Sequence, residues 1–317
     1  MKVSIGAKII DGPWGGGNLF VINLSSHLIE KGHEVIYDLN DDDIDLILLT
    51  DPRKSSESST FTHRNIKRYK KKNSKVKVVH RINECDERKN TRGLNKFYIK
   101  ANRIADHTIF VSNWLKNLYL KSGFENPNYS VIYSGSDKEV FNDFGKTRHV
   151  SGDPYKIVTH HWGGNWNKGF QVYEKLDKLI KKDDWNKKIQ FTYIGNIPKN
   201  FRFENTKHIS PLNGDSLAKE LKKHDIYLTA SLNEPSGNHH IEGAQCGLPL
   251  LYLKSGALPE YCEGYGLEFN ENDFIEKLDL MTIEYESFYN KMKSYPRNAK
   301  EMSEEYLELF INLMKNE

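Results

Sequence analysis

Short apolar runs typical of buried strands alternate with segments of helical spacing along almost the whole chain. One series begins with the strand-like run Lys2 to Ile9, which is followed by a glycine-rich break from Gly12 to Gly17. A second series begins with Lys156 to His160, after a polar, glycine-containing stretch at 144–153. Strands that alternate with helices form a parallel sheet covered by helices. Because the alternation occurs twice, the sequence predicts an α/β protein with two β/α/β domains.

The length of the chain agrees with this division, because 317 residues suffice for two domains that each bury a core. We predict an N-terminal domain at residues 1–150 and a C-terminal domain at residues 151–295. The last stretch, 296–317, is helical in composition and is expected to pack back on the N-terminal domain.

The sequence shows neither a targeting segment nor a membrane span. Lys8 and Asp11 interrupt the N-terminal residues, and no apolar run approaches the roughly 20 residues needed to cross a bilayer. The three cysteines, Cys85, Cys246 and Cys262, are too few and too scattered for a disulfide framework or a zinc cage. We therefore expect a soluble, cytoplasmic protein with reduced thiols.

Charge is distributed unevenly along the chain. The formal net charge is +3, yet the stretch from Arg64 to Arg103 holds 15 Lys or Arg residues against three acids. Such a stretch can meet nucleic acid or an anionic membrane surface, and a solvated helix face is the alternative explanation. We expect no nucleic-acid partner, and we leave open a peripheral contact with the anionic inner face of a membrane.

The most informative segment runs from Asn233 to Leu250, N-E-P-S-G-N-H-H-I-E-G-A-Q-C-G-L-P-L. Glu234 is expected on a loop, and Glu242 in the first turns of the helix that follows. The start of a helix offers free N–H groups that suit a phosphate, and nearby carboxylates can accept hydrogen bonds from sugar hydroxyls. This layout fits a sugar nucleotide. The alternative is that both acids only cap or decorate a structural helix.

This segment resembles the E-x7-E signature of family 4 retaining glycosyltransferases, which have the GT-B fold. Further segments are similar to family motifs in the expected order, over roughly residues 1 to 265: the glycines 15–17, K-G-H-E-V at 31–35, D-H-T-I-F-V-S-N-W-L at 106–115, V-I-Y-S-G-S-D-K-E-V-F at 131–141 and N-W-N-K-G-F at 165–170. The resemblance implies two Rossmann-like domains that face each other across a cleft. The first would lie on the acceptor side, and the second would hold the nucleotide-sugar donor.

The resemblance also implies roles for residues of the C-terminal domain. Lys168 would contact the donor diphosphate and neutralise the leaving group. Glu242 would bind the ribose hydroxyls, and Glu234 would contact the hydroxyls of the transferred sugar. The N–H groups around Gly237 and Asn238 would meet the sugar and the phosphate.

In the N-terminal domain, Gly16 and Gly17 would let the backbone approach the same phosphates from across the cleft. His80, in V-V-H-R, resembles a family histidine on the acceptor side and is a candidate catalytic residue together with Glu234 and Lys168. An ordinary histidine at the end of a strand is the alternative.

One departure from the family pattern concerns the phosphate site. The arginine that usually stands five residues before the lysine is replaced by Gly163. A planar guanidinium binds phosphate in a way that other side chains do not reproduce. Either His160, His161 or Asn165 partly replaces the arginine, or donor binding is weaker, or another phosphate contact is used. We include Asn165 among the candidate donor-binding residues.

Metal binding is not expected. The acidic run D-D-D-I-D at 41–45 resembles the D-x-D metal site of the other major glycosyltransferase fold, but it precedes a strand in a β/α series and is expected to form a turn. The adjacent histidine pairs at 160–161 and 239–240 lack the i, i+4 spacing of a helical zinc site. The glycine loop lacks the G-x-G-x-x-G spacing of dehydrogenases and has no following Walker lysine.

The sequence therefore predicts a metal-independent, retaining glycosyltransferase that uses no cofactor besides its nucleoside-diphosphate-sugar substrate. The acceptor would be a glycan or a lipid-linked glycan. Two alternatives are a sugar-nucleotide epimerase of the same fold and a non-catalytic nucleotide-sugar binding protein, which the glycine at position 163 makes conceivable.

Overall fold

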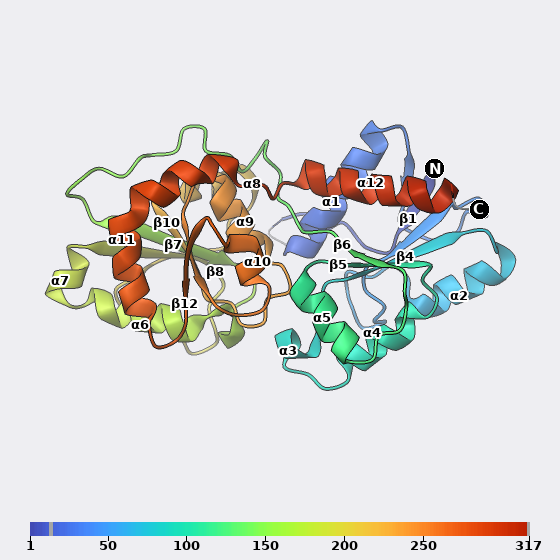
Figure 1. Ribbon diagram of the computed structural model, residues 1–317, viewed down its shortest axis with the longest axis horizontal. Coiled ribbons are helices and arrows are strands. Elements are labelled where there is room, and N and C mark those ends of the chain that lie inside the picture. The colour runs from blue at the N-terminus through green and yellow to red at the C-terminus, as the bar shows by residue number, and fades with distance from the viewer. Residues whose placement is uncertain (13–14, 316–317) are drawn as a thin grey trace. The chain divides into compact units, whose positions relative to one another are not determined.

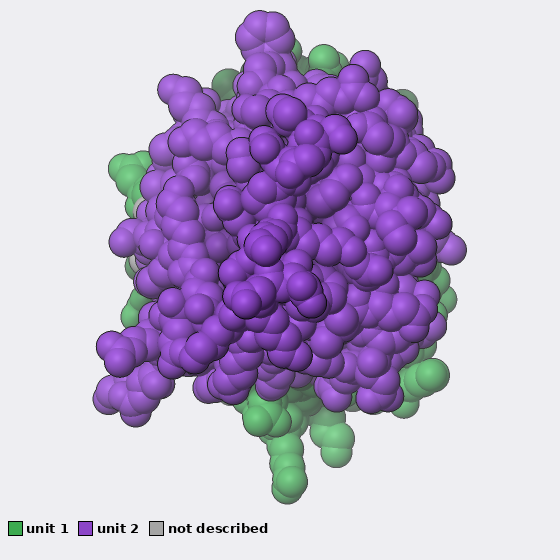
Figure 2. Space-filling model, turned by 90° about the vertical axis from the view of Figure 1, so that its left-hand side faces the viewer, with its two compact units in different colours: residues 1–135, 299–317 green, residues 136–298 purple. Residues whose placement is uncertain are grey.

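The computed structural model describes residues 1–12 and 15–315 (Figure 1). Residues 13 and 14 of the predicted glycine-rich break, and residues 316 and 317 of the predicted C-terminal helix, lie outside the described part. The chain divides into two compact units, which Figure 2 colours separately. Unit 1 comprises Met1–Gly135 and Ala299–Glu317, and unit 2 comprises Ser136–Asn298.

Unit 1 is built on a six-stranded parallel sheet with strand order β2-β1-β3-β4-β5-β6. The strands are β1 (Lys2–Ile5), β2 (Glu34–Ile36), β3 (Leu46–Leu49), β4 (Lys77–Ile82), β5 (His107–Phe110) and β6 (Tyr129–Val131). The helices are α1 (Gly16–Glu30), α2 (His63–Lys72), α3 (Asp86–Lys89), α4 (Leu94–Asn102), α5 (Asn113–Lys121) and α12 (Ala299–Lys315).

The alternation of side chains along the strands decides which helices cover which face of this sheet. On β4, Val79 belongs to an apolar cluster with α1 and α12, whereas Val78 belongs to a cluster with α2. The C-terminal helix α12 packs beside α1 (Figure 1) and contributes Tyr306 and Phe310 to the first cluster. The end of the chain thereby completes the core of its first half.

Unit 2 repeats the plan with strand order β12-β11-β10-β7-β8-β9, again all parallel. Its strands are β7 (Tyr155–His161), β8 (Ile189–Gly195), β9 (Lys207–Ile209), β10 (Ile226–Thr229), β11 (Leu250–Leu253) and β12 (Gly266–Phe269). Its helices are η1 (Trp166–Lys168), α6 (Phe170–Ile180), α7 (Asp183–Asn186), α8 (Gly214–Leu221), α9 (Asn238–Gln245), α10 (Leu258–Cys262), α11 (Phe274–Lys291) and η2 (Met292–Ser294).

The strand orders locate the place in each sheet where ligands of such folds bind. Successive strands run outward in opposite directions from β1 and β3 in unit 1, and from β7 and β10 in unit 2. In open parallel sheets the crevice outside the carboxyl ends of the strands at this switch point is the usual ligand site. In unit 2 this rule places the expected ligand site at the loops after β7 and β10.

Segment 136–154 packs on unit 2, ahead of β7. The Lys146 ammonium donates a hydrogen bond to the His224 carbonyl at 2.9 Å, and the ring of His149 stacks on that of Tyr155 with 3.8 Å between centroids. Among the described residues, no helix is both long enough and apolar enough to span a membrane.

Close packing of α9 on β10 depends on Gly243. A Cβ at this position would lie 2.2 Å from Cδ2 of the buried Tyr227. We expect Gly243→Ala to lower the free energy of unfolding by about 1–3 kcal/mol, because the ring or the helix must move. Gly17→Ala on α1 is the matched control, since a Cβ there meets nothing within 4 Å and alanine favours a helix over glycine by about 1 kcal/mol. Urea unfolding measures both, and equal stabilities would contradict this packing.

Candidate active site

The loops after β7 and β10 bring Lys168 and Glu234 together at the carboxyl edge of the unit 2 sheet. Lys168 ends the short helix η1 that follows β7, and Glu234 lies in the loop between β10 and α9. The Lys168 Nζ is 3.3 Å from Glu234 Oε2, and the two side chains are 16% and 10% exposed. A cation and a carboxylate are thus held together, largely shielded from water.

The segment S-G-A at 255–257 fixes the backbone on which Glu234 lies. The Ser255 hydroxyl accepts a hydrogen bond from the Asn233 N–H at 2.8 Å, and the Glu234 carbonyl accepts one from the Ala257 N–H at 2.8 Å. A Cβ at Gly256 would lie 2.5 Å from the backbone nitrogen and oxygen of Glu234. The glycine therefore permits an approach that no larger residue allows.

The start of α9 borders this ion pair. Gly237 precedes the helix with φ of +83°, no side chain caps the helix, and its first turn contains no acid. A Cβ at Gly237 would meet the Glu234 Cγ and the His239 Cε1, both at 2.9 Å. The start of α9, with Gly237 and Asn238, therefore lies beside the ion pair of Lys168 and Glu234. The free N–H groups of this uncapped helix start favour an anion there.

Glu242 lies one turn further along α9, in a buried chain of hydrogen bonds. Its Oε2 is 2.7 Å from His160 Nε2, and the His160 Nδ1 is 3.0 Å from the Tyr227 hydroxyl. The same hydroxyl accepts a hydrogen bond from the His160 backbone N–H at 3.1 Å. Because a carboxylate can only accept hydrogen bonds, the His160 Nε2 carries the proton of this contact and donates it to Glu242. This chain orients the Glu242 carboxylate.

Three further histidines pack around this edge. The His161 Nε2 lies 2.8 Å from the Tyr173 hydroxyl, and the His239 Nε2 lies 2.8 Å from Thr229 Oγ1. Burial lowers the pKa of His239 well below its usual value and lowers that of His240 to about 3. Because these two rings are uncharged at neutral pH, they cannot replace the charge of the missing arginine.

The position of that arginine is occupied by Gly163, next to Lys168. A Cβ at Gly163 would lie 3.3 Å from Asn165 Nδ2 and 3.6 Å from Lys168 Cε. Of the three residues suggested as replacements, His160 is bound to Glu242 and His161 contacts Tyr173. Asn165, whose amide lies beside the glycine, is the one nearest to the vacated position.

In unit 1, Gly16 and Gly17 form the first turn of α1, which follows Gly15 and has no side-chain cap. His80 lies on β4 and is fully buried. Its Nδ1 is 3.1 Å from Asn102 Nδ2, its ring stacks on Tyr98, and burial lowers its pKa to about 3. His80 is therefore a neutral hydrogen-bonding group at physiological pH.

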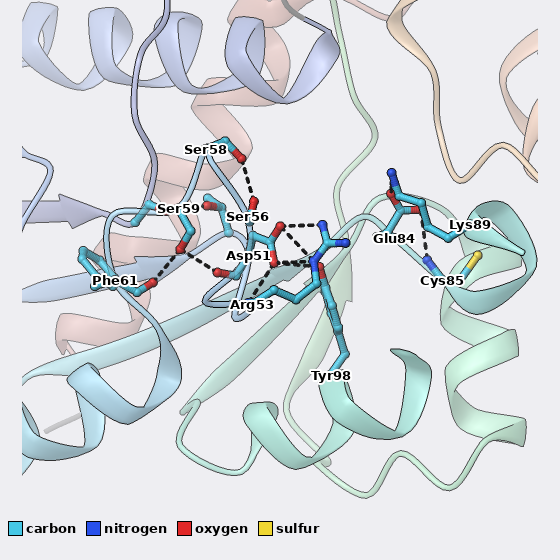
Figure 3. A network of polar contacts seen from close by, with 12 residues as sticks. Asp51, Arg53, Ser56, Ser58, Ser59, Phe61, Glu84, Cys85, Lys89 and Tyr98 are labelled. Carbon is cyan, nitrogen blue, oxygen red and sulfur yellow. Dashed lines mark hydrogen bonds and ion pairs between the residues drawn. The ribbon is translucent and has the colours of Figure 1, made fainter. Parts of the chain in front are cut away.

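A polar network at the carboxyl edge of unit 1 was not predicted from the sequence (Figure 3). Asp51, after β3, accepts hydrogen bonds from Arg53 Nε at 2.9 Å and Arg53 Nη2 at 2.6 Å, and Tyr98 donates to it at 3.2 Å. Glu84, after β4, pairs with Lys89 at 2.9 Å. The signal that could have revealed this network is an acidic residue two positions after the end of each of two neighbouring strands.

The acidic run at 41–45 forms ion pairs instead of a metal cage. Lys2 Nζ lies 2.9 Å from Asp41 Oδ2 and 2.8 Å from Asp43 Oδ1. In the part of the chain that the structure describes, no group of three or more His, Cys, Asp or Glu residues is arranged to hold a metal ion.

Solved structures resemble the whole chain in fold. Sucrose-phosphate synthase of Thermosynechococcus elongatus has a TM-score of 0.70 at 12% identity, with 100% of both chains covered. The catalytic domain of Arabidopsis thaliana starch synthase IV, bound to ADP and acarbose, has a TM-score of 0.72 at 13% identity, with 99% of both chains covered. Anabaena HepE, in complex with UDP and glucose, has a TM-score of 0.69 at 13% identity and covers 98% of this chain and 100% of its own.

These structural neighbours are GT-B glycosyltransferases of the family 4 type. The chain has the GT-B fold that the sequence predicts, with one six-stranded parallel sheet in each unit. No family model and no curated protein matches the sequence. The likeness therefore defines the fold, and the activity has to be argued from the site.

Proposed function

We propose that the protein is a glycosyltransferase that transfers a sugar from a nucleoside-diphosphate-sugar donor held by unit 2. The observation that carries this proposal is the Lys168–Glu234 pair, 3.3 Å apart, beside the uncapped start of α9. A cation, free N–H groups and a carboxylate in one place match the phosphates and the hydroxyls of a sugar nucleotide. The UDP and ADP complexes of HepE and starch synthase IV agree with such a donor.

In the proposed reaction the bond between the anomeric carbon and the diphosphate breaks, and an acceptor hydroxyl oxygen forms the new bond to that carbon. Negative charge develops on the leaving diphosphate, which takes up the proton of the hydroxyl. Lys168 and the N–H groups at the start of α9 stabilise this charge, so that no divalent cation is needed for the purpose. Glu234 accepts hydrogen bonds from the hydroxyls of the transferred sugar. Glu242, oriented by His160, binds the ribose hydroxyls.

Unit 1 binds the acceptor, a glycan or a lipid-linked glycan, in this proposal. The Asp51–Arg53 pair and the Glu84–Lys89 pair offer several hydrogen-bonding groups at the carboxyl edge of its sheet. The proposal includes retention of the anomeric configuration, as the resemblance to family 4 implies, by attack from the face that the diphosphate leaves.

A screen of nucleoside-diphosphate sugars tests the proposal. A ligand that binds only the folded state raises the melting temperature, so the correct donor is expected to stand out in a thermal-shift series. Transfer from that donor to an acceptor panel, followed by mass spectrometry, then demonstrates the activity. The proposal would be contradicted if no nucleotide sugar raised the melting temperature of the protein.

A non-catalytic nucleotide-sugar binding protein is the second candidate, because glycine replaces the usual phosphate-binding arginine at position 163. This candidate predicts donor binding without hydrolysis of the donor and without transfer to any acceptor of the panel. Measured release of nucleoside diphosphate separates the two candidates.

Restoring the missing guanidinium is expected to strengthen donor binding. In Gly163→Arg, the new Cβ meets only the ends of the Asn165 and Lys168 side chains, at 3.3 and 3.6 Å. A charge-assisted hydrogen bond to phosphate contributes about 1.5–3 kcal/mol, so we expect the Kd of the nucleoside diphosphate to fall roughly tenfold or more. Gly163→Gln is the control of similar length without charge. Isothermal titration calorimetry measures both, and equal affinities in the two variants would contradict the placement of the phosphates.

A further inference from the structure

Two neighbouring helices of unit 1 expose a dense group of cations. α2 and α4 lie side by side (Figure 1), since the ring centroids of His63 and Phe97 are 5.6 Å apart and Lys70 Nζ is 3.5 Å from the Ile104 carbonyl oxygen. The exposed cations on these helices and directly after them are Arg64, Lys67, Arg68, Lys71, Lys72, Lys75, Lys96, Lys100 and Arg103. We call the surface that these residues form the cationic track.

The spacing of these residues directs their charges away from the core. Side chains three, four and seven positions apart share one side of a helix. At the outer side of α4, Lys96, Lys100 and Arg103 follow this spacing. On α2 the apolar side chains Ile66 and Tyr69 pack in the core cluster, so the cations of this helix occupy its solvent side.

In the part of the chain that the structure describes, no acid pairs with the cationic track. The sequence holds no Asp or Glu at 62–83 or at 88–105. Acids that border the track are already paired: Asp106 lies 3.1 Å from Lys70, and Asp41 and Asp43 lie 2.9 and 2.8 Å from Lys2. Like charges on neighbouring helical positions repel one another, so a partner with negative charge is favoured here.

The cationic track runs from one edge of the unit 1 sheet to the other. Tyr98 of α4 donates a hydrogen bond at 3.2 Å to Asp51, which follows β3 at the carboxyl edge. Tyr69 of α2 donates one at 2.7 Å to the carbonyl of Asp41, which precedes β3. The ten residues of α2 span about 15 Å. A chain that lies along the track can therefore end at the network of Asp51 and Arg53.

The side chains of this surface favour a charged sugar chain over a membrane or a nucleic acid. Helices that dock on a bilayer bury an apolar face in it, but none of the large apolar side chains described as exposed lies on α2 or α4. Single-stranded nucleic acids stack their bases on aromatic rings. The rings of Tyr69 and Tyr98 are only 7% and 1% exposed, and Phe97 is half-buried.

We propose that the cationic track binds an acceptor polysaccharide that carries repeated carboxylate or phosphate groups, with the end of this polysaccharide at the carboxyl edge of unit 1. Binding of the anionic polysaccharide does not require the donor. That this polysaccharide is the acceptor of the sugar rests on the proposed function.

Oligogalacturonates of increasing length test the track, because they are soluble sugar chains with a carboxylate on every residue. In isothermal titration calorimetry with the full chain, we expect the affinity to rise with length until the oligomer spans the track. Added salt should weaken this binding. The triple variant Lys67→Glu, Lys71→Glu, Lys100→Glu should bind the long oligomer about tenfold or more weakly, because attraction becomes repulsion at three positions.

The matched control is the triple variant Lys181→Glu, Lys182→Glu, Lys187→Glu, which changes the net charge equally at exposed positions of unit 2. It should bind the oligomer as the parent protein does. If the first triple variant fails to fold, the same three positions of the track are changed to Gln. Equal affinities of the track variant and the control, or an affinity that does not depend on oligomer length, would overturn the proposal.

Two further probes address the other partners. Sedimentation with phosphatidylglycerol vesicles, or binding of a single-stranded oligonucleotide, would overturn the proposal if the track variant abolished it while oligogalacturonate did not bind. Oligogalacturonate binding through the track in a protein without transferase activity would support the polyanion site and reject the proposed function. Transfer at equal rates by the parent and the track variant, to charged and neutral glycans alike, would uphold the proposed function and overturn the anionic acceptor.

Discussion

Lys168→Ala is expected to reduce the rate of sugar transfer by about 100- to 1,000-fold, which is the usual effect of removing one preorganised group that stabilises transition-state charge. Glu234→Ala is expected to have an effect of similar size, because the transferred sugar loses its carboxylate contact. Both changes also remove one charge of the 3.3 Å ion pair, which is largely shielded from water. Initial rates with the donor identified by thermal shift measure the loss.

A double variant separates this catalytic effect from loss of stability. Lys168→Met with Glu234→Gln replaces the ion pair by neutral side chains of similar size, so we expect most of the stability lost in either single variant to return. Activity should not return, since the diphosphate still lacks its cation. A double variant that regains both stability and near-normal transfer would show that the pair is only structural.

The second large effect is expected at Glu242. Glu242→Ala should raise the Kd of the nucleoside diphosphate by about tenfold or more, because ribose hydrogen bonds to a charged group are lost. His160→Phe keeps an aromatic ring but cannot donate to the carboxylate, so it should raise the donor KM with a smaller change in kcat. Tyr227→Phe removes the hydroxyl that contacts His160 Nδ1, and so tests the hydrogen-bonded series Tyr227–His160–Glu242 at its far end from the ribose.

Deoxynucleotides give this prediction a direct control. The wild-type protein should discriminate against a 2′-deoxy or 3′-deoxy nucleoside diphosphate, and Glu242→Ala should bind the ribose and deoxyribose forms about equally. Discrimination that persists unchanged in Glu242→Ala would place the ribose elsewhere.

Much of the fold was predictable because its signals are local. Parallel strands that are buried on both faces appear as short apolar runs, and glycine-containing breaks separate them from helices. The run Leu46–Leu49, for example, is buried at all four positions in β3. The order of the strands within each sheet could not be read from such patterns, because it depends on contacts between distant segments.

The candidate site was predictable to the extent that it lies on continuous motifs. Gly237, Asn238 and Glu234 belong to one segment, and Lys168 belongs to a second motif. The structure brings Lys168 Nζ to 3.3 Å from Glu234, although the two residues are 66 positions apart in sequence. The partner of Glu242 was not predictable, since His160 reaches it only through the pairing of β7 with β10. The network of Asp51 and Arg53 was missed because each of its loops is unremarkable on its own.

The crystal structure of the full chain with UDP, GDP or ADP is the most direct test of the central claim. The account predicts a diphosphate with oxygens within hydrogen-bonding distance of Lys168 Nζ and of the N–H groups at the start of α9, and a ribose beside Glu242. A nucleotide bound away from these groups, or no binding at millimolar concentration, would contradict it.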